Sequence, residues 1–131
     1  DYYLAMEGSL KLKEISYIHS EAFQAGELKH GSISLIDKDF GVIAVVTDKE
    51  ISEKTISNLK EVESRGANIV TITNIKNDDF SKYKILLDDY NEVLNPLLAI
   101  IPMQLLAYNV AKLKGYDIDK PRNLAKSVTV E

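Results

Sequence analysis

Several residue types and motifs are missing from this sequence of 131 residues, and each absence excludes a class of site. There is no cysteine, which excludes disulfide bonds, Cys-ligated zinc, iron–sulfur clusters and a cysteine nucleophile. There are two histidines, too few for a His-rich metal site, so no metal is expected. Neither GxGxxG nor a P-loop motif is present, which argues against the common nucleotide-phosphate loops.

The charge balance and the hydropathy pattern argue against nucleic acid and membranes as partners. Lys and Arg total 16 against 20 Asp and Glu, a formal charge of -4, so no overall basic field is expected for nucleic acid or anionic lipid. The most apolar stretch, residues 94–113, contains Pro96, Pro102 and several polar side chains, and its unbroken apolar runs are far shorter than the ~20 residues of a membrane span. No segment resembles a signal peptide, so we predict a cytoplasmic protein.

Helical and strand-like segments alternate along the chain, which predicts one α/β domain. Three apolar, β-branched runs predict buried strands, at residues 42–47, 68–73 and 85–87. Helical patterns cover residues 3–17, 21–28 and 48–65, and a long helix from Asn95–Pro96 to Gly115. Strands joined by helices imply right-handed crossovers and a parallel sheet. Three strands are few for such a sheet, so either the fold is small or an opening strand precedes residue 1.

The first predicted helix carries three charged side chains, Glu7, Lys11 and Glu14, along one strip of its surface. At about 100° per residue, they fall between two apolar stripes rather than opposite a single apolar face. Such spacing most often gives surface ion pairs worth ~0.2–0.5 kcal/mol each. A half-buried Glu–Lys–Glu cluster also suits proton transfer, with a carboxylate to move the proton and an ammonium to hold an oxygen. The residues alone leave both interpretations open.

Five further polar residues are weaker candidates. His30 lies in a glycine-flanked loop, where a histidine is more often solvated than catalytic, and His19 better fits a packed structural role. A lysine near the end of a chain, as Lys126 is, is nearly always solvated. Asp88 and Asp89 follow a predicted strand and suggest a metal site, but two acids without further ligands are more typical of a solvated turn.

Motifs at opposite ends of the chain resemble one family. They are MEGSLKLKEISYIHSEAF at residues 6–23, GELKHG at 26–31, QLLAY at 104–108 and DKPRNLAKSVTVE at 119–131. They closely resemble the last sugar-isomerase (SIS) domain of the glutamine–fructose-6-phosphate aminotransferases, and the likeness covers the whole chain. The resemblance implies that residues 1–131 are the second, C-terminal SIS domain of such a protein. The implied fold is a flavodoxin-like parallel sheet flanked by helices, without the family's opening strand and with a catalytic tail at residues 117–131.

The resemblance also implies roles for the charged residues of the first helix. By the family's pattern, Glu14 is the base that moves a proton between C1 and C2 of the sugar. Lys11 lies beside it and assists the proton transfers near the hydroxyl groups. Glu7 is the carboxylate near the ammonia-derived nitrogen.

Three residues outside that helix have roles implied in the same way. His30 opens the cyclic sugar, and in the family it reaches the site of the neighbouring subunit of a homodimer. Lys126 resembles the lysine that forms a Schiff base with open-chain fructose 6-phosphate, and Ala125 contributes a backbone contact. Ser32 stands where many relatives have proline and Asn109 where some have histidine, and neither position touches the chemistry directly.

The implied whole enzyme makes glucosamine 6-phosphate from fructose 6-phosphate and glutamine, with no metal or organic cofactor. Its glutaminase domain and its first SIS domain, whose Ser/Thr-rich loop holds the sugar phosphate, lie outside this chain, so the chain alone is expected to be inactive. Three alternatives are a module that senses a phosphosugar, a related SIS deglycase or isomerase that uses no ammonia, and a purely structural role in dimerisation.

Overall fold

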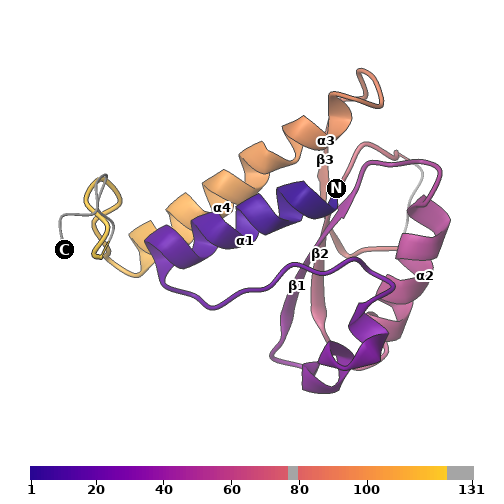
Figure 1. The fold of residues 1–131 in the computed structure, drawn as a ribbon, viewed down its shortest axis with the longest axis horizontal. Helices are drawn as coiled ribbons and strands as arrows, with labels where there is room; N and C mark the ends of the chain where they lie inside the picture. The colour runs from indigo at the N-terminus through magenta and orange to yellow at the C-terminus, as the bar shows by residue number, and fades with distance from the viewer. Residues whose placement is uncertain (77–79, 124–131) are drawn as a thin grey trace, which may run out of the picture.

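A parallel three-stranded sheet in the order β1–β2–β3 forms the centre of the larger end of the molecule (Figure 1). The computed structural model describes residues 1–76 and 80–123. The strands are β1 (Gly41–Val46), β2 (Asn68–Thr73) and β3 (Tyr83–Leu86). The predicted parallel sheet is confirmed, and β2 has the bounds that its β-branched run predicts.

Helices lie on both faces of this sheet (Figure 1). They are α1 (Tyr2–Ser16), α2 (Ser52–Glu63), α3 (Asn95–Leu98) and α4 (Ile100–Leu113), with short 3-10 helices η1 (Leu28–His30) and η2 (Ser32–Leu35). On one face, Ala44 and Val46 of β1 pack with Leu59 and Val62 of α2. On the other, Ile72 of β2 packs with the start of the α4 layer. This two-sided burial explains why the central strand is almost continuously apolar or β-branched.

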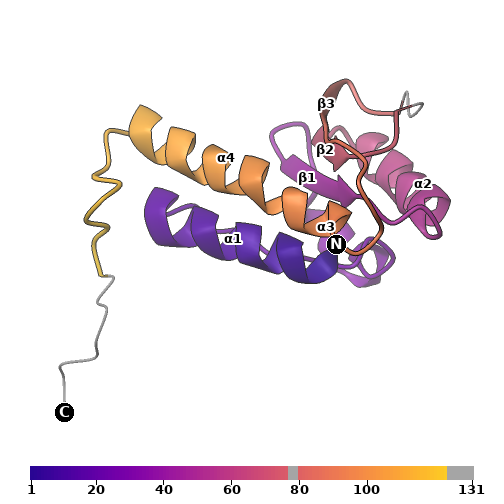
Figure 2. The same ribbon diagram turned by 90° about the horizontal axis from the view of Figure 1, so that it is seen from above.

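α1 and α4 run side by side in the same direction and extend well past the sheet (Figure 2). Small residues allow their backbones to approach closely. Gly8 of α1 faces Met103 of α4, and Ala107 and Ala111 are fully buried. The hydroxyl of Ser16 donates a hydrogen bond of 2.8 Å to the carbonyl oxygen of Ala107. The two helices are therefore closely packed, and α1 carries the predicted charged residues.

The contact at Gly8 predicts a large effect on stability. A Cβ atom at this position would overlap Sδ of Met103 and would lie 3.0 Å from Cβ of the same residue. We expect Gly8→Val to lower the free energy of unfolding by about 1–3 kcal/mol, because overpacking would force the helices apart. Urea unfolding of the chain measures this. Lys13→Val, at an exposed position of the same helix, is the control and should change the free energy by less than about 0.5 kcal/mol. If the free energy of unfolding fell equally in the two variants, the added side chain at position 8 would not strain the contact between the helices.

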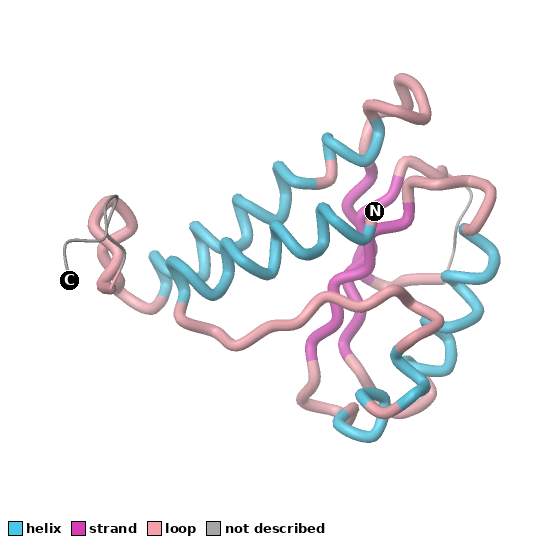
Figure 3. Tube along the Cα trace, in the orientation of Figure 1, coloured by secondary structure: helices cyan, strands magenta, loops and turns pink. Residues whose placement is uncertain are grey.

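The predicted helix over residues 21–28 is wrong. Residues 17–27 form a long connection with one turn at its end, drawn as a loop in Figure 3. Tyr17 ends α1 in a left-handed conformation with φ of 54°. A short segment becomes helical when it can pack an apolar face, and Phe23, the largest apolar side chain here, is exposed. The helical pattern is therefore not realised before the short helix η1.

The predicted long helix is divided into α3 and α4 by a turn at Ala99. Pro102 has no N–H to donate to the carbonyl of Leu98, which explains the break at this point. Together the two helices span 19 residues, Asn95–Leu113, and are long and apolar enough to cross a membrane by length and composition alone. One such helix is weak evidence for a membrane span, since core helices pass the same test, and Ala99 and Met103 here pack against the sheet.

Candidate functional site

The predicted charged cluster is present on α1. Nζ of Lys11 lies 2.7 Å from Oε2 of Glu14 and 3.5 Å from Oε1 of Glu7, so one ammonium links two carboxylates. The exposed fractions of the side chains are 41% for Glu7, 32% for Lys11 and 27% for Glu14. Glu14 is therefore the less accessible carboxylate and also the one in the shorter contact.

The cluster is less enclosed than its spacing predicts. Met6 and Leu10, from one of the two flanking apolar stripes, are exposed in the described part of the chain. Helical spacing places these side chains beside the charges, as predicted, but it does not determine whether other residues cover them, and within residues 1–76 and 80–123 none covers them fully. The cluster thus opens to the surface on this side.

Within the cluster, the hydrogen bond to Glu14 raises the pKa of Lys11 above its usual value. Partial burial acts in the opposite direction, but the negative charges of Glu14 and Glu7 raise the pKa further. Lys11 therefore remains protonated at neutral pH and can donate hydrogen bonds but cannot accept a proton. This leaves the carboxylates, and Glu14 foremost, as the groups able to take a proton from a substrate.

Among the described residues, neither histidine makes a hydrogen bond or ion pair with this cluster. His30 ends η1, just before Gly31, and is exposed; among the described residues its imidazole makes no hydrogen bond or ion pair. The prediction of a packed role for His19 is wrong. Its side chain is 83% exposed, with Nε2 3.7 Å from a carboxylate oxygen of Glu21, because the left-handed turn at Tyr17 ends α1 before it.

Ala125 and Lys126 lie outside the described residues, but the segment that leads to them returns to α1. The rings of Tyr17 and Tyr116 have centroids 4.9 Å apart. The backbone N–H of Arg122 donates to the hydroxyl of Tyr17 over 2.8 Å, and its guanidinium carbon lies 4.1 Å from the centre of the same ring. Tyr17 comes three residues after Glu14, so the start of the tail lies against the end of the helix that carries the cluster.

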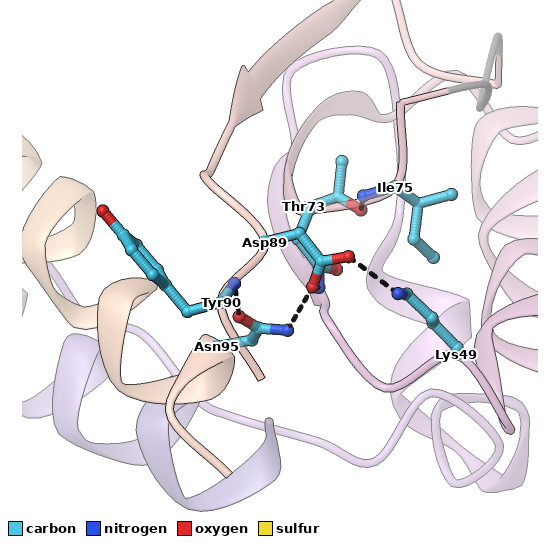
Figure 4. A network of polar contacts seen from close by, with 7 residues as sticks. Lys49, Thr73, Ile75, Asp89, Tyr90 and Asn95 are labelled. Carbon is cyan, nitrogen blue, oxygen red and sulfur yellow. Dashed lines mark hydrogen bonds and ion pairs between the residues drawn. The ribbon is translucent and has the colours of Figure 1, made fainter. Parts of the chain in front are cut away.

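A second polar cluster connects the loops at the carboxyl ends of the strands (Figure 4). One carboxylate oxygen of Asp89 lies 2.8 Å from Nζ of Lys49, and the other accepts hydrogen bonds from the amides of Asn74 (3.1 Å) and Asn95 (2.7 Å). These contacts, that with Lys49 first, lower the pKa of Asp89 and keep it ionised. The side-chain oxygen Oδ1 of Asn95 in turn accepts the backbone N–H of Tyr90.

This second cluster joins the loops, and both Asp88 and Asp89 are exposed, as predicted for a solvated turn after the strand. The side chain of Asn91 accepts the N–H groups of Val93 and Leu94 just before α3. Within residues 1–76 and 80–123, no group of three or more His, Asp or Glu side chains is placed to hold a metal ion. Asp88 and Asp89 therefore do not form a metal site with their described neighbours.

The sequence of this chain is similar to one family of domains and to curated proteins that share one name. The model of the family described as "SIS domain" matches residues 1–114. The glutamine–fructose-6-phosphate aminotransferase (isomerizing) of Clostridium perfringens is 54% identical over 136 aligned positions, which cover 100% of this chain and 22% of that protein. The protein of the same name from Rhizobium meliloti is 52% identical, over 98% of this chain and 22% of the relative. The chain thus spans about a fifth of these curated relatives.

Solved structures give the same relationship at the level of the fold. The C-terminal domain of glucosamine–fructose-6-phosphate aminotransferase from Francisella tularensis superposes with a TM-score of 0.82 at 45% identity, covering 91% of this chain and 34% of that one. Glucosamine-6-phosphate deaminase from Thermotoga maritima gives a TM-score of 0.75 at 27% identity, covering 97% of this chain and 37% of that one. Both structures match most of this chain within a longer chain.

Proposed function

Because this chain belongs to the SIS domain family, and because its relatives at more than half identity are aminotransferases of one name, we propose that it is the C-terminal part of the isomerase module of a glutamine–fructose-6-phosphate aminotransferase. The whole protein would make glucosamine 6-phosphate from fructose 6-phosphate and glutamine. The observation that carries this proposal is the Glu7–Lys11–Glu14 cluster beside the docking point of the C-terminal tail.

The charges on α1 suit the isomerisation half of this reaction. A base must take a proton from one carbon of the C1–C2 pair and return it to the other, while the adjacent oxygen is stabilised. The Glu14 carboxylate would carry the proton. Lys11, whose pKa is raised by that carboxylate, would stay charged and donate hydrogen bonds to sugar oxygens. Glu7, bound to the other side of the same ammonium, would lie near the nitrogen at C2.

The tail would supply the nucleophile. In its neutral form the amine of Lys126 adds to the C2 carbonyl of open-chain fructose 6-phosphate, and water leaves as the Schiff base forms. Lys126 is four residues after Arg122, a span of at most ~14 Å, and Tyr17 is about 4.5 Å along the helix axis from Glu14. These lengths allow the amine to reach the cluster, and Ala125 would add a backbone contact to the sugar.

The rest of the site would come from other parts of the protein. The exposure of His30 is consistent with the proposal that it serves the sugar site of a second subunit in a homodimer. Since the described residues hold no phosphate-binding loop, the sugar phosphate would be held by the first SIS domain, and ammonia would come from a glutaminase domain.

Two features support burial of this chain against further protein. Leu97, Ile101 and Leu105 form a stripe on α3 and α4, and about half of each side chain is exposed. In addition, β1 pairs only with β2 among the described strands. The carboxylate of Asp1 accepts the backbone N–H of Thr47, just after β1, so α1 begins beside the unpaired edge of this strand. A parallel strand before α1 would fit this edge with a right-handed crossover.

We also propose that the whole assembly lies in the cytoplasm.

An activity assay tests the proposal. The full-length protein should form glucosamine 6-phosphate from glutamine and fructose 6-phosphate, measured by mass spectrometry of the product. Residues 1–131 alone should form none, because they contain no cysteine nucleophile and no phosphate loop. Synthesis by this chain alone would contradict the assignment of the missing functions to other domains. A full-length protein that binds the sugar but makes no product would instead favour a sensing module.

A further inference from the structure

Tyr17 connects the end of α1 to the start of the C-terminal tail. It adopts a left-handed backbone conformation with φ of 54°, which is uncommon for an aromatic residue and ends the helix at this point. Its sequence position, directly after the charged cluster, gives no hint of a tertiary role. Nevertheless it makes three separate contacts with residues about a hundred positions further along the chain.

Two of these contacts use the ring of Tyr17 and the third uses its hydroxyl. The ring packs against Tyr116 at an interplanar angle of 57°, with centroids 4.9 Å apart. The ring also lies beneath the guanidinium of Arg122, 4.1 Å from its centre, a cation–π geometry. The hydroxyl accepts the backbone N–H of Arg122 over 2.8 Å. The hydrogen bond fixes the backbone of the tail itself, not only a side chain.

From this arrangement we propose that Tyr17 is a positioning residue, which anchors the start of the C-terminal tail to the end of α1 and so holds Lys126 within reach of Glu14. This inference rests on the proposed function, because it gives Lys126 its role. Four residues separate the anchored N–H from Lys126, so the anchor limits the volume that the amine can explore. Holding the reacting groups together in this way accelerates a reaction without any contact between Tyr17 and the substrate.

Two measurements on the full-length protein test this inference. Tryptic cleavage after Arg122, followed by mass spectrometry, reports whether the tail is held, whatever the chemistry of the protein. Borohydride trapping of fructose 6-phosphate on Lys126 reports whether the amine is in place. The variants are Tyr17→Leu, which removes the ring and the hydroxyl, and Tyr17→Phe, which removes the hydroxyl alone. Tyr3→Leu, at an exposed aromatic position on the same helix, is the matched control.

We expect Tyr17→Leu to speed tryptic cleavage by roughly tenfold and to slow trapping by a similar factor, with Tyr17→Phe between it and the wild type. The KM for fructose 6-phosphate should change little while kcat falls, because the phosphate is held by other groups. Tyr3→Leu should behave as the wild type. Cleavage of Tyr17→Leu at the wild-type rate would show that the tail is not anchored here. Faster cleavage with unchanged trapping would overturn the positioning role. Absence of trapping in the wild type itself would instead refute the proposed function, while cleavage would still decide whether Tyr17 is an anchor.

Discussion

Replacing Glu14 with glutamine in the full-length protein is expected to lower kcat for glucosamine 6-phosphate formation by about 10²- to 10⁴-fold, the usual loss when a general base is removed. Glutamine has the shape of glutamate and can still accept the hydrogen bond from Lys11, but its amide cannot carry a proton. KM for fructose 6-phosphate should change little. The control is Glu21→Gln, which neutralises a more exposed carboxylate in the connection after α1 and should leave the rate unchanged. A Glu14→Gln protein with normal turnover would exclude this carboxylate as the base.

Mixed dimers separate a catalytic defect in Glu14→Gln from a folding defect. If His30 serves the neighbouring subunit, a dimer of one Glu14→Gln subunit and one His30→Ala subunit has one site with both defects and one intact site. Random exchange of the two inactive proteins should then restore about a quarter of wild-type activity. No recovery after verified exchange would place His30 and Glu14 of the same subunit in one site, whereas a His30→Ala protein that is active by itself would place His30 in no site.

Lys126→Arg is expected to abolish synthesis more completely than Glu14→Gln. The guanidinium keeps the positive charge and the length of the side chain, but it stays protonated at any pH at which the protein is folded and cannot form a Schiff base. The product assay used for Glu14→Gln measures the loss. Lys120→Arg, in the described part of the same tail, is the control and should retain full activity. Retained synthesis by Lys126→Arg would remove the nucleophile from the proposed mechanism.

The sheet and the charged cluster could be predicted because each depends on local pattern. The β-branched run at residues 68–73 has no alternative to burial between two layers, and it forms β2 with those bounds. Glu7, Lys11 and Glu14 share one strip of α1 at any helical geometry, so their contacts follow from spacing alone.

Features that depend on tertiary packing could not be predicted in this way. The segment at residues 21–28 has the composition of a helix but too little apolar surface in contact, so it remains a loop. Asp89, predicted to lie in a solvated turn, is exposed, and it also ties Lys49 to two asparagines because the strand ends meet at one edge. The hydrogen bond between Tyr17 and Arg122 joins residues 105 positions apart, and nothing in the immediate neighbours of Tyr17 indicates it.

Reductive trapping is the most direct measurement of whether the tail amine meets the sugar. The full-length protein is incubated with fructose 6-phosphate, reduced with borohydride, digested and mapped by mass spectrometry. We predict one covalent sugar adduct, on Lys126, which is absent from Lys126→Arg and present in Lys120→Arg. An adduct on a different lysine, or no adduct in the wild-type protein under turnover conditions, would contradict the assignment of Lys126 as the lysine that forms the Schiff base.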